Sequence, residues 1–504
     1  MEKVDSVWAK YTDKETFERI VDYESVGDMW AHCVQEFSQK TAIVDGEEYT
    51  YSRLDGYVAR FRTALKNNGL GKGGLTGILL PNSVGFVTAF LAVTTYGAAA
   101  VLFPVHMESG KIRSYMQKFS VTALIHDDST AETAQKAVDG GECMLINVNN
   151  LPEESTPANE CSPSDACAVI FTSGTDGRGR GALLNNRAVM RGVKNGCFGY
   201  KDVFGQRYFL ILPLTHVFGL VRNMLTPLYT GSSLYISDRN KNLFKEISKF
   251  NPTVLVLVPA LAEMALNFSK HFKRNMLGDS VKYIICGAAA VPPYLVKSYA
   301  EYGIKLFPGY GLTESANLVS GNPESLNKPD SVGIIYEGLD YKVVDGELWL
   351  KGVNMMDGYL NDSAENASAY CGDWFKTGDL VKFDDEGFLY IVGRKKDIIV
   401  LSNGENVSPV EIETKFTDLS VVQDALVYEG KNENGKQILV LEVYPRNVEL
   451  EKLEKAEREP YLRKVIADVN ETLPSFGRIQ KVIIRDKDFE RNSSMKIIRK
   501  KHND

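Results

Sequence analysis

The sequence predicts an α/β protein with a large N-terminal domain of helix-flanked β-sheets, a small β-barrel-like part, and a small α+β C-terminal domain. Three observations support this. Short runs rich in β-branched residues recur between longer amphipathic stretches, as at residues 168–172, 253–258 and 281–286, which is typical of parallel or mixed sheets covered by helices. The pattern changes near residue 333 and again after residue 394. A chain of 504 residues is also too long for a single compact core.

The apolar stretch at residues 73–107 contains no Asp, Glu, Lys or Arg and could be either a membrane span or part of a buried core. A membrane-spanning helix needs about 20 consecutive apolar residues, but prolines and glycines interrupt this stretch. We therefore favour a buried strand–helix–strand unit over a membrane span. Its predicted elements are a strand at 76–80, a helix at 84–96 and a strand at 98–103.

Residues 333–393 show short strand-like segments separated by Gly and Asp turns. The segments at 341–344, 347–351 and 389–392 predict a small antiparallel sheet or barrel.

The remaining C-terminal part of the chain predicts a separate domain of about 110 residues. We expect strands at 398–401, 438–444 and 481–484, and helices at 409–416 and 460–473. The expected domains are residues 1–394 and residues 395–504.

Composition excludes several classes of protein. The formal net charge is −7, whereas nucleic-acid-binding domains usually carry a basic surface, so we expect no nucleic-acid partner. Seven cysteines without a C-x-x-C pair argue against a zinc site or a disulfide framework. The N-terminus has no basic segment followed by an apolar one. We therefore expect a cytoplasmic protein with no integral membrane span.

A glycine-rich block at residues 172–181 directly follows the apolar strand residues 168–171. It reads T-S-G-T-D-G-R-G-R-G, with four glycines, three hydroxyls and two arginines. Glycines let backbone N–H groups turn toward an anion, while hydroxyls and guanidinium groups add donors. The block matches neither a Walker A loop nor G-x-G-x-x-G. Phosphate binding is the functional interpretation, and a flexible surface loop is the structural alternative.

Two further blocks carry oxygen ligands. Thr313 and Glu314 end the segment G-Y-G-L-T-E, where a hydroxyl could contact a phosphate and a carboxylate could bind Mg²⁺. Asp379 ends W-F-K-T-G-D, where a carboxylate could accept both hydroxyls of a ribose. The structural alternatives are a threonine helix cap and a turn aspartate that bonds its own backbone.

Taken together and in this order, these blocks resemble the acyl-adenylate-forming superfamily, which includes acyl-CoA synthetases, peptide-synthetase adenylation domains and firefly luciferase. The resemblance spans most of the chain. The matching segments are the phosphate loop at 172–181, the adenine-side turn at 287–289, Y-G-x-T-E at 310–314, further signatures at 346–348 and 358–361, the ribose-and-hinge signature at 377–379 and 393–397, the first loop of the small domain at 403–413, and the C-terminal lysine motif at 496–499.

The resemblance implies a ligase that uses ATP and Mg²⁺ to join a small carboxylic acid to AMP, releases pyrophosphate, and then transfers the acyl group to CoA. It implies catalytic roles for Lys496, Thr313, Glu314 and His216, with Glu314 on the metal. The implied nucleotide and CoA contacts are Thr172, Ser173, Gly174, Thr175, Gly177, Arg180, Gly287, Ala288, Ala289, Tyr310, Gly311, Asp379, Arg394, Lys396 and Gly404.

The resemblance implies a separate role for each group of these residues. Thr172, Ser173, Thr175 and Arg180 would hold the β- and γ-phosphates, and Thr313 the α-phosphate. Asp379 and Arg394 would hold the ribose, and Lys496 would bridge the carboxylate and the α-phosphate. Lys396 would be the hinge on which a mobile small domain swings, which places Gly404 near the thiol tunnel. The structural alternatives are ordinary solvated lysines at 396 and 496.

The acid pocket is implied to be lined by His216, Phe218, Gly287 and Gly309. Amino-acid-activating domains usually place an Asp near the segment 213–219, and none is present there, so an amino acid substrate is not expected. His216 could instead be a satisfied core histidine.

Two rival functions stay open. The same chemistry could load the phosphopantetheine thiol of a carrier protein instead of CoA. Alternatively, Asp176 in the phosphate loop and the altered residues 493–495 before Lys496 fit a non-catalytic nucleotide- or acyl-binding protein on a decayed scaffold. An oligomer is also compatible with the sequence.

Overall fold

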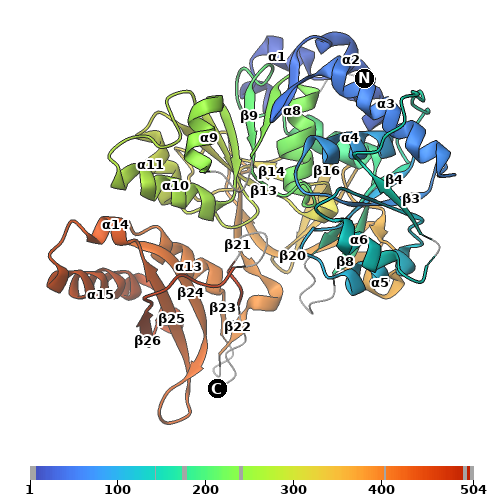
Figure 1. Ribbon diagram of the computed structural model, residues 1–504. Helices are drawn as coiled ribbons and strands as arrows, with labels where there is room; N and C mark the ends of the chain where they lie inside the picture. The colour runs from blue at the N-terminus through green and yellow to red at the C-terminus, as the bar shows by residue number, and fades with distance from the viewer. Residues whose placement is uncertain are drawn as a thin grey trace.

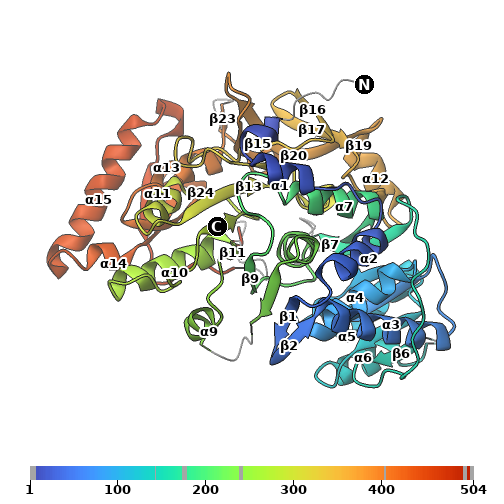
Figure 2. The same ribbon diagram turned by 90° about the horizontal axis from the view of Figure 1, so that it is seen from above.

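The computed structural model describes residues 7–141, 143–172, 179–237, 242–401, 405–491 and 497–499. These residues form the large N-terminal domain and the small C-terminal domain that the sequence predicts. In Figure 1 the small domain, coloured orange to red, lies beneath α10 (Pro259–His271) and α11 (Pro293–Ala300). Figure 2 shows the same neighbours from above.

The first sheet of the large domain has seven strands within the described residues. Five of these described strands run parallel, and two more pair antiparallel at one edge, the outermost of which comes from a distant part of the sequence. In spatial order they are β18 (Gly358–Tyr359), β8 (Arg180–Asn185), β7 (Ala166–Thr172), β4 (Ala99–Leu102), β3 (Leu75–Leu79), β5 (Ala123–His126) and β6 (Met144–Asn147).

The second sheet has nine strands within the described residues, with a parallel centre. The predicted strands at 253–258 and 281–286 correspond to its neighbours β11 and β12. In spatial order the strands are β15 (Ile334–Ile335), β14 (Ser320–Gly321), β13 (Lys305–Tyr310), β12 (Tyr283–Cys286), β11 (Val254–Leu257), β9 (Arg207–Leu210), β10 (Ser233–Ile236), β1 (Thr41–Asp45) and β2 (Glu47–Thr50).

The third sheet is antiparallel and occupies the region where the sequence pattern changes. Its described strands are β16 (Leu339–Val344), β17 (Glu347–Gly352), β20 (Trp374–Phe383), β19 (Tyr370–Cys371) and β21 (Leu389–Arg394). The last strand leads directly into the 3₁₀ turn η4 (Lys395–Asp397) and the small domain.

Helices cover these sheets. They are α1 (Lys14–Arg19), α2 (Val26–Phe37), α3 (Tyr51–Asn67), α4 (Val84–Thr95), α5 (Ser109–Phe119), α6 (Ala131–Val138), α7 (Asn186–Asn195), α8 (Thr226–Tyr229), α9 (Leu243–Phe250) and α12 (Ser363–Ala369), together with α10, α11, the short turns η1 (Val7–Lys10) and η3 (Thr313–Ser315), and the π-helix η2 (Phe218–Leu225).

The apolar stretch forms the predicted strand–helix–strand unit. The helix α4 follows β3 and precedes β4, and its residues 86–95 are all buried. Ser83 caps the helix by accepting a hydrogen bond from the Phe86 amide. Within the described residues, no helix combines the length and the apolar character that crossing a membrane requires.

Within the described residues, the small domain packs helices against a three-stranded sheet. Its elements are β22 (Ile399–Val400), β23 (Asn406–Val407), α13 (Pro409–Thr417), β24 (Val422–Lys431), β25 (Gln437–Pro445), α14 (Asn447–Leu450), α15 (Lys455–Thr472), η5 (Ser475–Gly477) and β26 (Lys481–Ile484).

Two predicted boundaries in this domain were wrong. The strand expected at 398–401 is only the two-residue β22, because β23, its one partner in the described residues, is equally short. The helix expected from Pro460 begins at Lys455, so the proline lies inside it. Proline is favoured in the first turn of a helix, which made it look like the start, whereas the five preceding residues are good helix formers.

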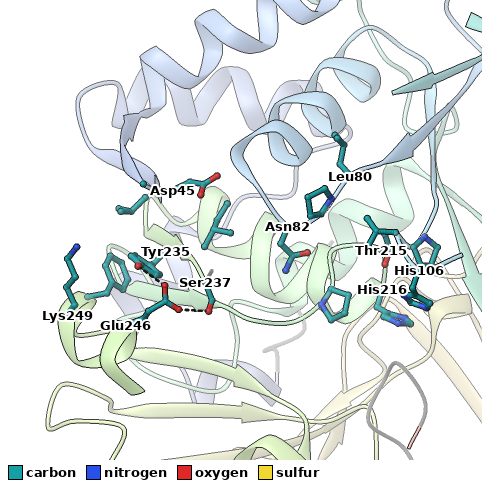
Figure 3. Close-up of a pocket in the computed structure, with 18 of the residues that line it drawn as sticks. Asp45, Leu80, Asn82, His106, Thr215, His216, Tyr235, Ser237, Glu246 and Lys249 are labelled. Carbon is teal, nitrogen blue, oxygen red and sulfur yellow. Dashed lines mark hydrogen bonds between the residues drawn. The ribbon is translucent and has the colours of Figure 1, made fainter. Parts of the chain in front are cut away.

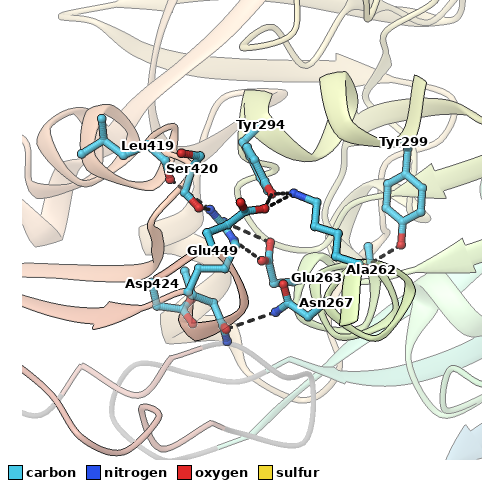
Figure 4. Close-up of polar contacts among 12 residues, drawn as sticks. Ala262, Glu263, Asn267, Tyr294, Tyr299, Leu419, Ser420, Asp424 and Glu449 are labelled. Carbon is cyan, nitrogen blue, oxygen red and sulfur yellow. Dashed lines mark hydrogen bonds and ion pairs between the residues drawn. The ribbon is translucent and has the colours of Figure 1, made fainter. Parts of the chain in front are cut away.

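A buried ion pair joins the two domains (Figure 4). Arg446 follows β25 and is fully buried, and its guanidinium donates to both carboxylate oxygens of Glu263 on α10, at 2.5 and 3.3 Å. The same guanidinium donates to the carbonyls of Leu419 and Ser420 and lies 3.9 Å from the ring centre of Tyr294 on α11. The small domain therefore holds the guanidinium in place, and the large domain supplies its counter-charge.

We predict that Glu263→Gln loosens the contact between the domains. Removing one partner of a buried ion pair leaves the other charge uncompensated and costs roughly 3–5 kcal/mol. Small-angle X-ray scattering should show a larger radius of gyration for this variant.

The matched control is Glu459→Gln, which removes the exposed pair with Arg463 within α15. It should scatter like the wild type. Equal scattering by both variants would contradict the assignment of the Arg446–Glu263 pair as the docking contact.

Candidate active site

A cavity of about 910 Å³ lies where the two large sheets, the antiparallel sheet and the start of the small domain meet. The strands β7, β12 and β13 end at its wall, at Thr172, Cys286 and Tyr310. Ligands of open α/β sheets bind at the carboxyl ends of the strands. The fold therefore directs the residues that follow these strands into one space.

Most of the sequence-predicted site residues within the described chain line this cavity. They are Thr172, Arg180, His216, Phe218, Gly287, Ala288, Gly309, Tyr310, Gly311, Thr313, Glu314, Arg394 and Lys396. Ala289 is exposed and is not among the lining residues. The predicted residues Ser173, Gly174, Thr175, Gly177, Gly404 and Lys496, and Asp176 with them, lie outside the described residues.

The ends of the phosphate-loop block face each other across a hairpin. In the antiparallel pairing of β7 with β8, Thr172 stands opposite Arg180. The Arg180 guanidinium pairs with Glu365 of α12 at 2.8 Å. A phosphate entering here would compete with Glu365 for the guanidinium.

Asp379 is buried, and its carboxylate contacts two residues that line the cavity. Its side chain accepts a hydrogen bond from the Tyr310 hydroxyl at 2.5 Å and pairs with the Arg394 guanidinium at 2.8 Å. The ion pair follows from the register, because Asp379 on β20 stands opposite Arg394 on β21. The Asp379 carboxylate raises the pKa of Arg394 above its usual value.

Glu314 lies on η3, where its carboxylate accepts a hydrogen bond from the buried Tyr359 hydroxyl at 2.7 Å. Among the described residues, no cluster of three or more His, Cys, Asp or Glu side chains could hold a metal ion. Mg²⁺ is usually held by one or two carboxylates together with substrate phosphates. A single carboxylate beside Thr313 fits that mode of binding.

The loop before η3 tolerates only glycine at position 311. A Cβ atom there would lie 1.3 Å from the backbone oxygen of Asn317, far inside van der Waals contact. This close approach holds the segment that carries Thr313 and Glu314 against the wall of the cavity.

The start of the small domain closes one side of the cavity. Lys395 on η4 donates to the buried Glu347 carboxylate at 3.0 Å, and the Gly378 amide donates to the same carboxylate at 3.0 Å. Burial by itself would raise the pKa of the Glu347 carboxyl. These donors, together with Trp349, outweigh the effect of burial, so the pKa lies below its usual value. For Lys396, burial and then the nearby Arg394 guanidinium lower the pKa.

His216 stands between two cavities. A second cavity, of about 960 Å³, shares Pro213, His216 and Ser237 with the first. In Figure 3, His216 and Thr215 lie on the side of His106, and Glu246 lies across the space near Ser237 and Tyr235. His216 is therefore part of the wall of both cavities.

Sequence reasoning missed several residues that position this site. Asn82 holds the turn before His216 by donating to the Leu212 carbonyl and accepting from the Leu214 amide, at 2.7 and 3.0 Å. Tyr359, Glu347 and Glu365 also support or line the cavity. Glu347 and Tyr359 lie within the matched signatures at 346–348 and 358–361 and could have been singled out, whereas Asn82 and Glu365 lie outside the matched segments and take their partners from distant parts of the sequence.

The chain matches two protein families. The family described as "AMP-binding enzyme" matches residues 30–360, and the "AMP-binding enzyme C-terminal domain" matches residues 396–504.

Individual relatives agree with these matches. The Probable CoA ligase CCL9 of Humulus lupulus is 26% identical over 451 residues, which is 82% of this chain and 85% of the relative. The Oxalate–CoA ligase of Arabidopsis thaliana is 25% identical over 463 residues, 84% of this chain and 90% of the relative. The crystal structure of the anthranilate CoA ligase AuaEII with anthranoyl-AMP has the same fold, with a TM-score of 0.82 at 20% identity, covering 95% of this chain and 96% of that one.

We predict that Gly311→Ala greatly weakens ATP binding, because the added methyl group would push the Thr313–Glu314 segment away from its place. Isothermal titration calorimetry with Mg·ATP should show an affinity lower by about 10-fold or more, corresponding to about 1.4 kcal/mol.

The matched control is Gly56→Ala in α3, where a Cβ atom meets nothing within 4 Å. Alanine is the better helix former, so this variant should bind ATP normally and be slightly more stable. Normal ATP binding by Gly311→Ala would show that this segment does not contact the nucleotide.

Proposed function

Because the chain belongs to the AMP-binding enzyme family, we propose that it is a carboxylic acid:CoA ligase that works through an acyl-AMP intermediate. The observation that carries the proposal is the convergence, on one cavity, of a phosphate-loop hairpin, the Thr313–Glu314 pair and the Asp379–Arg394 pair. These are the groups that the triphosphate, the metal and the ribose of ATP each require.

In the first step, a carboxylate oxygen of the acid attacks the α-phosphorus of ATP. The bond from that phosphorus to the oxygen bridging the α- and β-phosphates breaks, and pyrophosphate leaves with the bond's electron pair. Negative charge spreads over the phosphoryl oxygens during this step, so catalysis consists mainly of positioning and charge stabilisation.

Within this proposal the chain's own residues have defined tasks. Asp379, oriented by Tyr310 and Arg394, accepts the ribose hydroxyls, and Thr313 donates to the α-phosphate. Arg180 leaves Glu365 to hold the outer phosphates. Mg²⁺, bound through Glu314, would screen phosphate charge. Lys496 would place its ammonium between the carboxylate and the α-phosphate as a point charge.

In the second step, the thiol of CoA attacks the acyl carbon, and AMP leaves with the oxygen that came from the carboxylate. We take residues 1–394 and 395–504 as the two domains and Lys396 as the hinge between them. The position of Lys396 on η4, after the last strand of the third sheet, supports this assignment. A few residues at the end of an element commonly serve as a hinge.

CoA is favoured as the acceptor because the relatives described above are named CoA ligases. A carrier-protein partner, an oligomer and a cytoplasmic location stay predictions from the sequence. Glu314 and Arg394 line one cavity and Asp379 pairs with Arg394, which supports a working enzyme over a decayed scaffold.

The proposal is tested by mass spectrometry of the full-length protein incubated with Mg·ATP, CoA and a pooled library of carboxylic acids. An acyl-CoA product would support the proposal and name the acid. Acyl-AMP without acyl-CoA would shift the assignment to a carrier-protein ligase. ATP binding without either product across the library would favour the decayed scaffold.

We predict that Lys496→Ala lowers acyl-AMP formation by about 100-fold or more, because it removes a charge aimed at the transition state. Transfer of the acyl group from preformed acyl-AMP to CoA should be nearly unchanged. The two half-reactions can be followed separately by pyrophosphate release and by chromatography of acyl-CoA.

Lys501→Ala, in the same basic segment, is the control and should leave both half-reactions unchanged. An equal loss of both half-reactions in Lys496→Ala would show that the lysine has no special part in adenylation.

A further inference from the structure

The interior of the large domain contains an arginine without an acidic partner among the described residues. Arg222 on η2 is 3% exposed. Its Nη2 donates to the Tyr200 hydroxyl at 3.2 Å, and its Nη1 has no hydrogen-bond partner in the described part of the chain. Burying a charge is costly unless it is paired and hydrogen-bonded. A buried guanidinium with a free donor group therefore points to an anionic ligand.

Arg222 lies just beyond the end of the proposed acid pocket. Phe218 lines the pocket, and Arg222 follows it by four residues on the same helix, which places both near the same side. The Phe218 ring points toward Gly287, because a Cβ atom on that glycine would lie 3.7 Å from the ring. Phe218 thus contributes to the pocket wall from the same helix that carries the buried Arg222.

Contacts with the second sheet also place Arg222 close to the pocket. The Tyr200 ring, next to Arg222, packs on Tyr283 and Phe307, with ring centres 5.1 and 5.9 Å apart. These two residues precede Ile285 and Gly309, which line the pocket, by two positions on β12 and β13. Residues two apart on a strand share a face. Tyr200, with Arg222 beside it, therefore packs against two strands whose next residues on the same face line the pocket.

A second group in this region has unused hydrogen-bonding capacity. Asn195 is fully buried at the end of α7, and neither its amide nitrogen nor its amide oxygen has a partner among the described residues. The next residue, Gly196, approaches Arg222, since a Cβ atom there would lie 3.2 Å from Arg222 Cδ. Buried polar groups are otherwise almost always satisfied.

We propose that Arg222 binds an acidic group at the far end of the substrate, so that the acid activated is a dicarboxylic acid. The proposal rests on the proposed function. One carboxylate reacts beside Thr313, while the other displaces the Phe218 ring and pairs with the guanidinium, whose fork matches a carboxylate. A monocarboxylic acid of the same length would leave the buried charge uncompensated.

The test is acyl-AMP formation by the wild-type enzyme with straight-chain dicarboxylic acids of four to ten carbons and the monocarboxylic acids of equal length. A dicarboxylic acid should have the highest kcat/KM, at least about 100-fold above its monocarboxylic match. A preference for monocarboxylic acids would overturn the proposal and leave the ligase assignment intact. Acyl-AMP from none of these acids would also overturn it, and the pooled library then tests the ligase assignment separately.

Two variants identify the residue responsible. Arg222→Met keeps the length of the side chain without its charge, and should lower kcat/KM for the preferred dicarboxylic acid by about 100-fold while leaving its monocarboxylic match unchanged or improved. Arg222→Lys keeps the charge and should recover part of that loss. Equal losses for both acids in Arg222→Met would assign Arg222 a structural role. The wild-type comparison needs no variant, so the proposal is testable even if Arg222→Met does not fold.

Discussion

The site depends on one buried carboxylate. Asp379 joins three parts of the structure, because it lies on β20, accepts from Tyr310 at the end of β13 and pairs with Arg394 at the end of β21. The end of the second sheet, the antiparallel sheet and the entry to the small domain are thereby tied at one point. A buried carboxylate needs such partners, so the interaction that stabilises Asp379 also positions Arg394 and the adjacent η4 against the cavity.

The contacts between the domains extend this arrangement. The small domain is held at one end by η4, with Lys395 on Glu347, and at the other by Arg446 on Glu263. The first contact borders the cavity and the second lies on α10. A small domain that swings about Lys396 would have to separate Arg446 from Glu263, and the desolvated charges make that separation costly. If the small domain swings as proposed, the balance between its poses is set partly by a pair far from the reacting atoms.

Much of the fold was predictable because its signals are local. Buried strands such as β7 and β12 are short β-branched runs, and the buried unit around α4 is marked by its proline and glycine boundaries. The motifs that line the cavity could be found because consecutive residues carry them. Asn82, Glu365 and Arg446 could not be found in this way, since their partners lie far away in sequence. The start of α15 was misplaced because a proline that usually opens a helix lies inside it.

The most direct test of the account follows one oxygen atom. A carboxylic acid accepted by the enzyme is labelled with ¹⁸O in its carboxylate and incubated with the protein, Mg·ATP and CoA, and the AMP formed is analysed by mass spectrometry. If the carboxylate attacks the α-phosphorus and the thiol then displaces AMP, each AMP formed carries one oxygen atom from the carboxylate. AMP without the label, or label in inorganic phosphate, would contradict the acyl-AMP mechanism.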